Sequence, residues 1–215
     1  VSFGLKDAPN PLVSRLSYPL ATRLFTFTAG EATLDVKPGM GSNFPATQPL
    51  GRFLPGLAWT LVFAGQSGGK DALAPQVRAY PRLSAPDQGL GSINLRLIHA
   101  GPDTPAVDVL ADKMALFSGV AYGQVGAPRT LLLDAGLKGL LSGAGLTVNT
   151  AGSATRLFTI KVPADKLSKL DGNAVSVLIS GLSTDMNNKR SARAVLENLA
   201  STNNFAEVVD LTLAP

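Results

Sequence analysis

The sequence contains no cysteine and a single histidine, and these two shortages exclude several kinds of chemistry. Without cysteine the chain holds no disulfide scaffold, thiolate metal site or thiol nucleophile. A copper- or zinc-dependent oxidoreductase on a β-sandwich, similar to superoxide dismutase, needs several imidazole ligands, which one histidine does not supply. That enzyme class is the alternative that the sequence disfavours. The expectation is a protein that is not an enzyme and needs no cofactor or metal.

Charge and long apolar runs are also scarce. Charged residues make up 16% of the chain and hydrophobic residues 45%, whereas charged residues usually make up about 25%. The net charge of +4 comes from scattered Lys and Arg side chains, which indicates a solvated surface and no nucleic-acid interface; contact with an acidic envelope polymer is the alternative. The longest apolar stretch, residues 53–64, includes Pro55 and is shorter than the roughly 18–20 residues of a membrane span. No transmembrane segment is predicted.

Glycine and proline are abundant, with 22 and 15 residues, and they separate short apolar runs. This spacing favours turns and short strands. Residues 93–98 and 157–162 alternate between apolar and polar, as half-buried strands do, and the uncharged segments 59–63 and 175–179 are typical of central strands. The sequence therefore predicts an all-β protein made of two tandem antiparallel immunoglobulin-like β-sandwich domains.

Two segments also fit a helix. Residues 163–170 begin with proline and predict one helical turn. Residues 192–199 have apolar side chains at helical spacing, but an internal repeat assigns the start of this segment to a strand.

The internal repeat consists of four collinear matches. They join 1–4 to 120–123, 28–33 to 150–155, 54–65 to 170–181, and 77–79 to 192–194. A fifth match, of 22–26 with 155–159, breaks the order and is treated as coincidence. The repeat predicts a first domain at 1–88, lacking its opening strands, and a complete second domain at 89–215 that carries a C-terminal strand extension, with residues 83–91 as linker.

In this alignment the first copy has no counterpart of residues 93–119. A sandwich without its opening strands exposes sheet edges, so we expect the natural chain to extend upstream by about 30 residues or more, after an export signal. That extension would hold a first strand and a corner like the one near His99. The alternative is that a partner strand, or the C-terminal segment 208–213, fills the gap by strand addition.

The sharpest local motif is His-Ala-Gly-Pro-Asp-Thr-Pro-Ala-Val-Asp-Val at residues 99–109, followed by Gly-Val-Ala-Tyr-Gly at 119–123. It resembles the opening of the bacterial domain-of-unknown-function 4397 family, with Gly101 in place of the usual serine. The resemblance covers residues 93–196, and reaches 1–82 only through the repeat. It implies tandem β-sandwich modules on exported or envelope proteins, a family with no established chemistry.

The motif is expected to form a corner between two strands. Its prolines, Pro102 and Pro105, fix φ, and Asp103 can accept backbone hydrogen bonds in the turn. We expect the His99 ring to bond this loop and Asp108 to lie on the following strand. The candidate site consists of five residues, which are expected to form a structural corner and a candidate binding surface: His99, Pro102, Asp103, Pro105 and Asp108. No catalytic residue is predicted, and metal binding by His99 with Asp103, Asp108 and Asp112 is the weaker interpretation.

The functional expectation is a non-enzymatic structural or interaction module of a bacterial cell envelope. Its expected partner is a protein of the envelope or surface layer, and it would be an accessory subunit of a surface-layer or outer-membrane assembly. Glycan binding on the loops is the third class, but Trp59, Tyr18, Tyr80 and Tyr122 are few and lie mostly in strand-like segments.

Trp59 carries a structural prediction of its own. Because Leu57, Trp59 and Leu61 alternate along one strand, all three are expected on its buried face. Replacing Trp59 with alanine would then cost about 3–5 kcal/mol.

Overall fold

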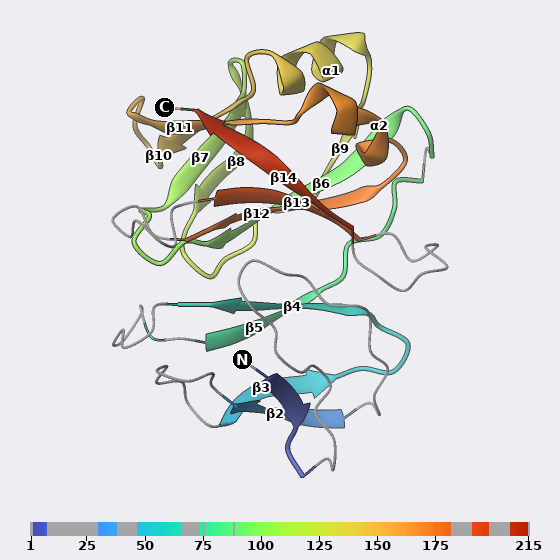
Figure 1. Cartoon of the computed structure of the whole chain (residues 1–215), viewed down its shortest axis with the longest axis vertical. Coiled ribbons are helices and arrows are strands. Elements are labelled where there is room, and N and C mark those ends of the chain that lie inside the picture. The colour runs from blue at the N-terminus through green and yellow to red at the C-terminus, as the bar shows by residue number, and fades with distance from the viewer. Residues whose placement is uncertain are drawn as a thin grey trace. The chain divides into compact units, whose positions relative to one another are not determined.

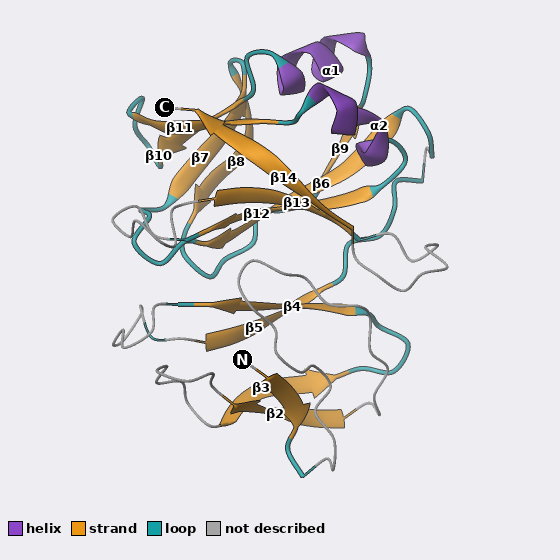
Figure 2. Cartoon of the chain, viewed as in Figure 1, coloured by secondary structure: helices purple, strands orange, loops and turns teal. Residues whose placement is uncertain are grey.

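The computed structural model describes residues 2–7, 30–37, 47–65, 74, 76–87, 89–181, 191–197 and 207–214. These fall into two compact units, which we call the first unit (described residues up to 82) and the second unit (described residues from 83 onward). Strands dominate both units, as the all-β prediction requires, and helices are few and short (Figures 1 and 2).

The first unit contains five strands in two sheets. Its three-stranded antiparallel sheet has the order β1–β2–β3, and its two-stranded sheet pairs β4 with β5. A small core lies between them, in which Leu34, Val36 and Val77 are buried. The strands are β1 (Ser2–Leu5), β2 (Gly30–Lys37), β3 (Thr47–Phe53), β4 (Trp59–Ala64) and β5 (Gln76–Pro81).

The prediction for the face of β4 is wrong. Trp59 is only half-buried, with its ring 5.0 Å from that of Phe53 and edge-on to it. Leu57 and Leu61 are 55% and 39% exposed, whereas Val62, on the opposite face, is buried. Because β4 carries apolar side chains on both faces, its alternation could not distinguish the core side from the other side.

The second unit is built on nine strands in one sheet, in the order β8–β7–β10–β11–β14–β13–β12–β6–β9. All neighbours are antiparallel except β6 and β12, which run parallel. The strands are β6 (Ser92–Ala100), β7 (Val107–Ala111), β8 (Met114–Val120), β9 (Arg129–Leu132), β10 (Leu146–Thr150), β11 (Arg156–Lys161), β12 (Ala174–Ser180), β13 (Ser191–Leu196) and β14 (Glu207–Ala214).

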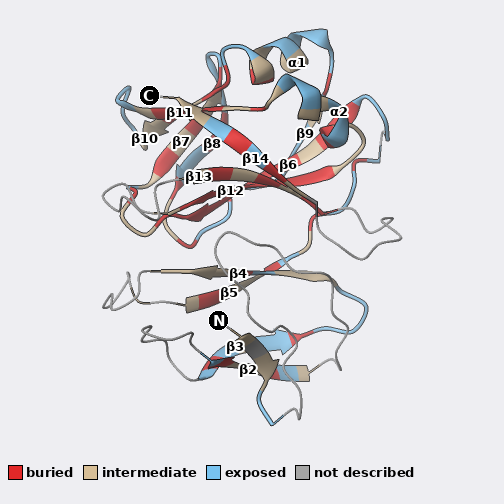
Figure 3. Ribbon diagram, viewed as in Figure 1, coloured by how far each residue is buried: buried red, intermediate tan, exposed pale blue. Residues whose placement is uncertain are grey.

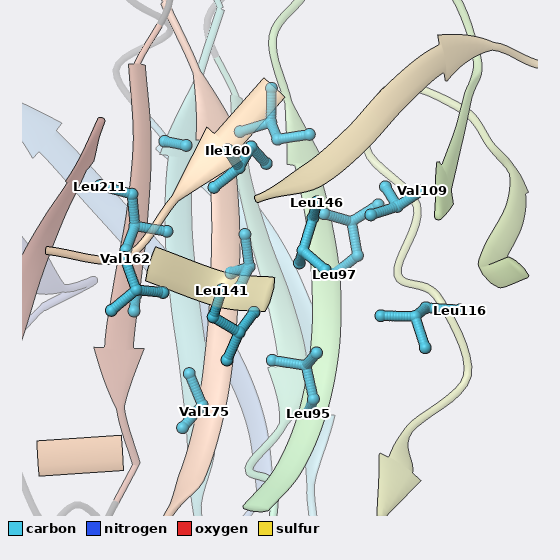
Figure 4. Packing of buried hydrophobic residues seen from close by; sticks show 14 of the residues in the cluster. Leu95, Leu97, Val109, Leu116, Leu141, Leu146, Ile160, Val162, Val175 and Leu211 are labelled. Atoms are coloured by element: carbon cyan, nitrogen blue, oxygen red, sulfur yellow. The ribbon is translucent and has the colours of Figure 1, made fainter. Parts of the chain in front are cut away.

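The last strand, β14, joins the two halves of this sheet. Its first part pairs with β13, at Ala192↔Leu211 for example, and its last part pairs with β11, at Ile160↔Leu213. Apolar side chains from both halves form one core. Figure 3 shows the buried parts of these strands in red. Figure 4 shows Leu95 of β6, Val175 of β12 and Leu211 of β14 around Leu141.

Leu141 belongs to α1 (Ala135–Ser142), a helix that the sequence analysis missed. Asp134 caps its first turn, because its Oδ1 accepts a hydrogen bond of 2.8 Å from Leu137 N. Its apolar positions 137, 140 and 141 have helical spacing, but two glycines within the helix and a third at its C-cap obscured it.

The two segments that also fit a helix in the sequence agree with their predictions where the structure describes them. Residues 163–170 form a 3₁₀ turn, Ala164–Lys166, followed by the short helix α2 (Leu167–Leu170). Residues 191–196 form strand β13, so the repeat-based interpretation is correct for that part of the segment. Residues 198–199 lie outside the described residues.

The internal repeat is visible in strand pairing. All six residue pairs of β4 with β5 have counterparts in β12 with β13, at offsets of 116 and 115; Leu61↔Ala79, for example, corresponds to Val177↔Ala194. One hydrogen bond beyond the strands also repeats. Arg82 N donates to Ala58 O at 2.8 Å, and Glu197 N donates to Ala174 O at 2.7 Å. Arg82 and Glu197 therefore occupy equivalent positions.

The two N-terminal matches of the repeat are displaced. The pair of β2 with β3 corresponds to that of β10 with β11, and each has one register shift, at Ala32/Thr33 and at Val148/Asn149, which gives an offset of 116 and not 122. Similarly, β1 pairs with β2 as β7 pairs with β10, so β1 corresponds to β7 and not to residues 120–123. The short matches at 1–4 and 28–33 misled because four to six small, turn-forming residues recur by chance.

This corrected alignment changes what the first unit lacks. Since β1 to β5 correspond to β7, β10, β11, β12 and β13, a counterpart of β7 is present in the first unit. Among the described residues, no strand of the first unit takes the place of β6 or of β14.

Candidate functional site

The candidate site lies at the end of β6, where His99 is completely buried. Gly101 N donates to the Nδ1 atom of the ring at 3.3 Å, and the Nε2 atom lies 3.0 Å from the carbonyl oxygen of Pro105. Because Nδ1 accepts, the proton resides on Nε2, which donates to that carbonyl. The ring is therefore a neutral tautomer held between two backbone groups of its own loop, and both nitrogens are engaged.

The second part of the motif packs against the same histidine. His99 N donates to Gln124 O at 3.1 Å, and Gly123 N donates to His99 O at 2.7 Å. The ring of Tyr122 lies edge-on to the imidazole, with 6.4 Å between ring centres. The two motif segments, 99–109 and 119–123, are thus joined around His99.

Asp108 connects β7 to two neighbouring backbone segments. Its Oδ1 accepts from Gly119 N at 2.7 Å, and its Oδ2 accepts from Gly152 N at 2.8 Å. Both glycines have φ in the left-handed region, +64° and +70°, where other residues are strained. The carboxylate therefore stabilises an irregularity in the pairing of β7 with β8 and the turn after β10.

The proline turn itself is short. Thr104 N donates to Gly101 O at 3.2 Å, which places Pro102 and Asp103 at the two central positions of the turn. A Cβ atom at Gly101 would lie 3.0 Å from Thr104 Oγ1, tighter than an ordinary contact. A side chain at this position would therefore require the Thr104 side chain to shift.

The structure does not gather the carboxylates of the motif into one site. Asp108 lies near the start of β7 and Asp112 lies beyond its other end, roughly 13 Å away at the rise of a strand. Within the described residues, no group of three or more His, Asp or Glu side chains is arranged to hold a metal ion.

A buried ionic cluster, which the sequence analysis missed, lies elsewhere in the second unit. The Arg96 Nη2 atom is 2.6 Å from Glu197 Oε1, and both side chains are at most 4% exposed. Ser176 Oγ accepts from Arg96 Nε and donates to Glu197 Oε1, each at 2.6 Å. Glu197 Oε2 accepts from Leu83 N at 2.7 Å.

This cluster connects β6, β12, the end of β13 and the first residue of the second unit. Every named polar atom has a partner within it, so the arrangement stabilises the fold and provides no free nucleophile or base. The one sequence signal was Arg96, a charge between Leu95 and Leu97 in a segment predicted to be a strand. Its partner lies 101 residues away, and no local pattern reveals it.

The core of the second unit contains a cavity of about 20 Å³ beneath α1. Its lining is entirely apolar and includes Leu95, Leu141 and Ile160. A space of this size and character holds no substrate and contributes no catalytic group.

Two further observations bear on the function classes. No helix in the described parts of the chain is long and apolar enough to cross a membrane. No protein-family model matches the chain, and no curated protein and no solved structure matches it either.

Proposed function

We propose that the chain is a non-enzymatic structural and interaction module of a bacterial cell envelope, built from tandem immunoglobulin-like sandwich units and accessory to a surface-layer or outer-membrane assembly. The observation that carries the proposal is the bonding of the motif. The ring of His99 and the carboxylate of Asp108 bond to backbone groups of adjacent turns. The most distinctive side chains of the chain therefore build the fold.

The repeated strand register also supports this proposal. The two units share the same pairing of five strands, so the same module is present twice. A tandem array of this kind suits an assembly protein.

Exposed apolar side chains supply a contact surface on the second unit. Leu90 is 84% exposed and Leu132 is 66% exposed. They lie close together, because Leu133 N donates to Gly91 O at 2.8 Å and so joins the end of β9 to the segment beside Leu90. Exposed apolar groups at a sheet edge favour association with another protein.

Fractionation of the producing cells, followed by cross-linking and mild solubilisation, tests the proposal. The chain is expected in the envelope fraction, in a stable complex. The amount of complex recovered with a Leu132→Glu variant should be lower than with the wild type. The amount recovered with Thr130→Glu, a change at an exposed position on the same strand, should equal that of the wild type. A protein found only as a cytosolic monomer would contradict the proposal.

Metal analysis tests the competing enzyme class. The purified protein is expected to contain no stoichiometric copper, zinc, manganese or iron. A redox metal at one equivalent, with dismutase activity, would replace the structural proposal by the enzymatic one.

A further inference from the structure

The nine-stranded sheet of the second unit ends at β9, whose outer edge is exposed. In the part of the chain that the structure describes, β6 is the one strand that pairs with β9 (Figure 1). Thr130 is exposed, and Leu132 is 66% exposed. Sheet edges are usually protected by charged side chains, proline or a bulge, because an unprotected edge pairs with another chain. Residues 130–132 carry none of these protections.

The backbone groups of two residues point to this outer edge. Leu133 N donates to Gly91 O at 2.8 Å, which identifies a hydrogen-bonded pair. Such pairs alternate with non-bonded pairs along an antiparallel ladder, and the register of β6 with β9 continues without a shift. The odd-numbered residues of β9 therefore bond to β6, whereas Thr130 and Leu132 direct their N–H and C=O groups outward.

The outer edge is also short. On one side, Pro128 has no N–H group to donate. On the other side, Asp134 O already accepts from Lys138 N at 2.9 Å, as the first bond of α1. A long extended segment of another protein would find no further donor or acceptor here, whereas a second β9 presents the same short set of groups.

We propose that this edge binds a second copy of the chain, with the two β9 strands antiparallel around a two-fold axis at Leu131. Thr130 of each copy then lies opposite Leu132 of the other, and their outward groups form about four hydrogen bonds. The two Leu132 side chains lie on one face as diagonal neighbours, within reach of each other. The interface is self-complementary, so it closes as a dimer.

Charge favours the same partner and the same register. Arg129 and Asp134 are both exposed, and Asp134 continues the extended backbone with φ −74° and ψ 178°. With the axis at Leu131, strand spacings place Arg129 of one copy about 6 Å from Asp134 of the other, between Cα atoms. The two Arg129 residues lie roughly 14 Å apart, whereas an axis at Thr130 would place them about 8 Å apart. Unlike charges therefore meet and like charges stay separate.

Sedimentation of the purified full chain tests the self-association. We expect a monomer–dimer equilibrium in which the dimer fraction rises with protein concentration. A Thr130→Pro variant lacks one outward N–H group, so the Kd of its dimer should be at least about tenfold higher. Thr130→Val retains this group and should dimerise as the wild type does, because Thr130 contributes through its backbone. Circular dichroism checks that both variants fold.

Cysteine pairs test the register without the proline variant. The chain has no cysteine, so one introduced thiol per copy reports one contact. A mixture of Thr130→Cys and Leu132→Cys chains should form disulfide-linked dimers, because the two positions lie about 5.5 Å apart between Cα atoms, within the roughly 4.4–6.8 Å that a disulfide spans. Either variant alone has its two thiols at positions roughly 9 Å apart and should cross-link at least about fivefold less.

Three results would overturn the proposal. These are a chain that stays monomeric at every concentration, a folded Thr130→Pro chain that dimerises as the wild type does, and cysteine variants that cross-link alone as well as together.

The inference rests on the proposed function, because it names the occupant of the contact surface at Leu132, but the two can fail separately. A purified chain that is monomeric, yet enters an envelope complex through Leu132, would contradict the second copy and retain the envelope role. A dimer found only in the cytosol would retain the second copy and contradict the envelope role.

Discussion

Single polar side chains determine the local geometry of the second unit. The His99 ring makes two hydrogen bonds within its own loop, whereas Asp108 and Glu197 each accept hydrogen bonds that join segments distant in sequence. Such groups are costly to bury without partners and costly to lose once partnered. The contribution of each side chain can therefore be measured as a change in the free energy of unfolding.

Replacing His99 with alanine should lower the free energy of unfolding by about 2–4 kcal/mol, because the change leaves Gly101 N buried without its partner, removes the partner of Pro105 O and opens a cavity. Denaturant titration followed by circular dichroism measures the loss. A loss below about 1 kcal/mol would show that water can replace the ring at little cost, and it would contradict a structural role for His99.

Replacing Glu197 with glutamine should cost about 3–5 kcal/mol, because Arg96 then remains charged in a buried site. The matched control is Asp210→Asn, since Asp210 is 81% exposed in its pair with Arg193; its loss should cost less than about 1 kcal/mol. Equal effects of the two variants would contradict this ranking.

At the scale of the element, β14 completes the sheet of the second unit. Its residues alternate: Val209 and Leu211 are buried in the core, and Asp210 and Thr212 are exposed. The strand satisfies the edges of β11 and β13 at once, so its inward side chains affect the whole unit.

The alternation gives a direct test. A Leu211→Asp variant should unfold the second unit or destabilise it by roughly 4 kcal/mol or more, because a carboxylate enters the apolar core. The neighbouring Thr212→Asp change should leave stability within about 0.5 kcal/mol. Proteolysis and NMR line dispersion distinguish the two; similar losses in both would mean that the strand does not alternate as described.

At the scale of the whole molecule, the chain divides into two units with separate cores. The single tryptophan, Trp59, belongs to the first unit. Its fluorescence therefore reports unfolding of the first unit alone, whereas far-ultraviolet circular dichroism reports both units.

We expect the two probes to separate when only one unit is weakened. In the Glu197→Gln variant, the circular dichroism transition of the second unit should move to lower denaturant, while the midpoint of the Trp59 transition stays within error of the wild type. A joint shift of both midpoints would show that the units unfold as one cooperative body.

Much of this architecture follows from patterns within a few residues. Alternation predicted the strands at 93–98 and 157–162, the absence of charge predicted the strand at 175–179, the repeat predicted that 191–196 is a strand, and proline predicted the turn at 163–170. The sequence also located the corner at 99–108, because the hydrogen bonds of His99 connect residues at most six positions apart through the ring. Local chemistry determines such features, and a sequence displays it directly.

Tertiary structure decided the rest. Which face of β4 is buried, where β1 stands in the repeat, and which residue neutralises Arg96 all depend on strands that meet from distant parts of the chain. The same holds for β14, whose insertion between β11 and β13 leaves no trace in its own alternation. Which strands pair and which face of a strand is buried depend on the energy of the assembled sheet. Strands that pair can lie far apart in the chain, so no short stretch of the sequence contains both of them.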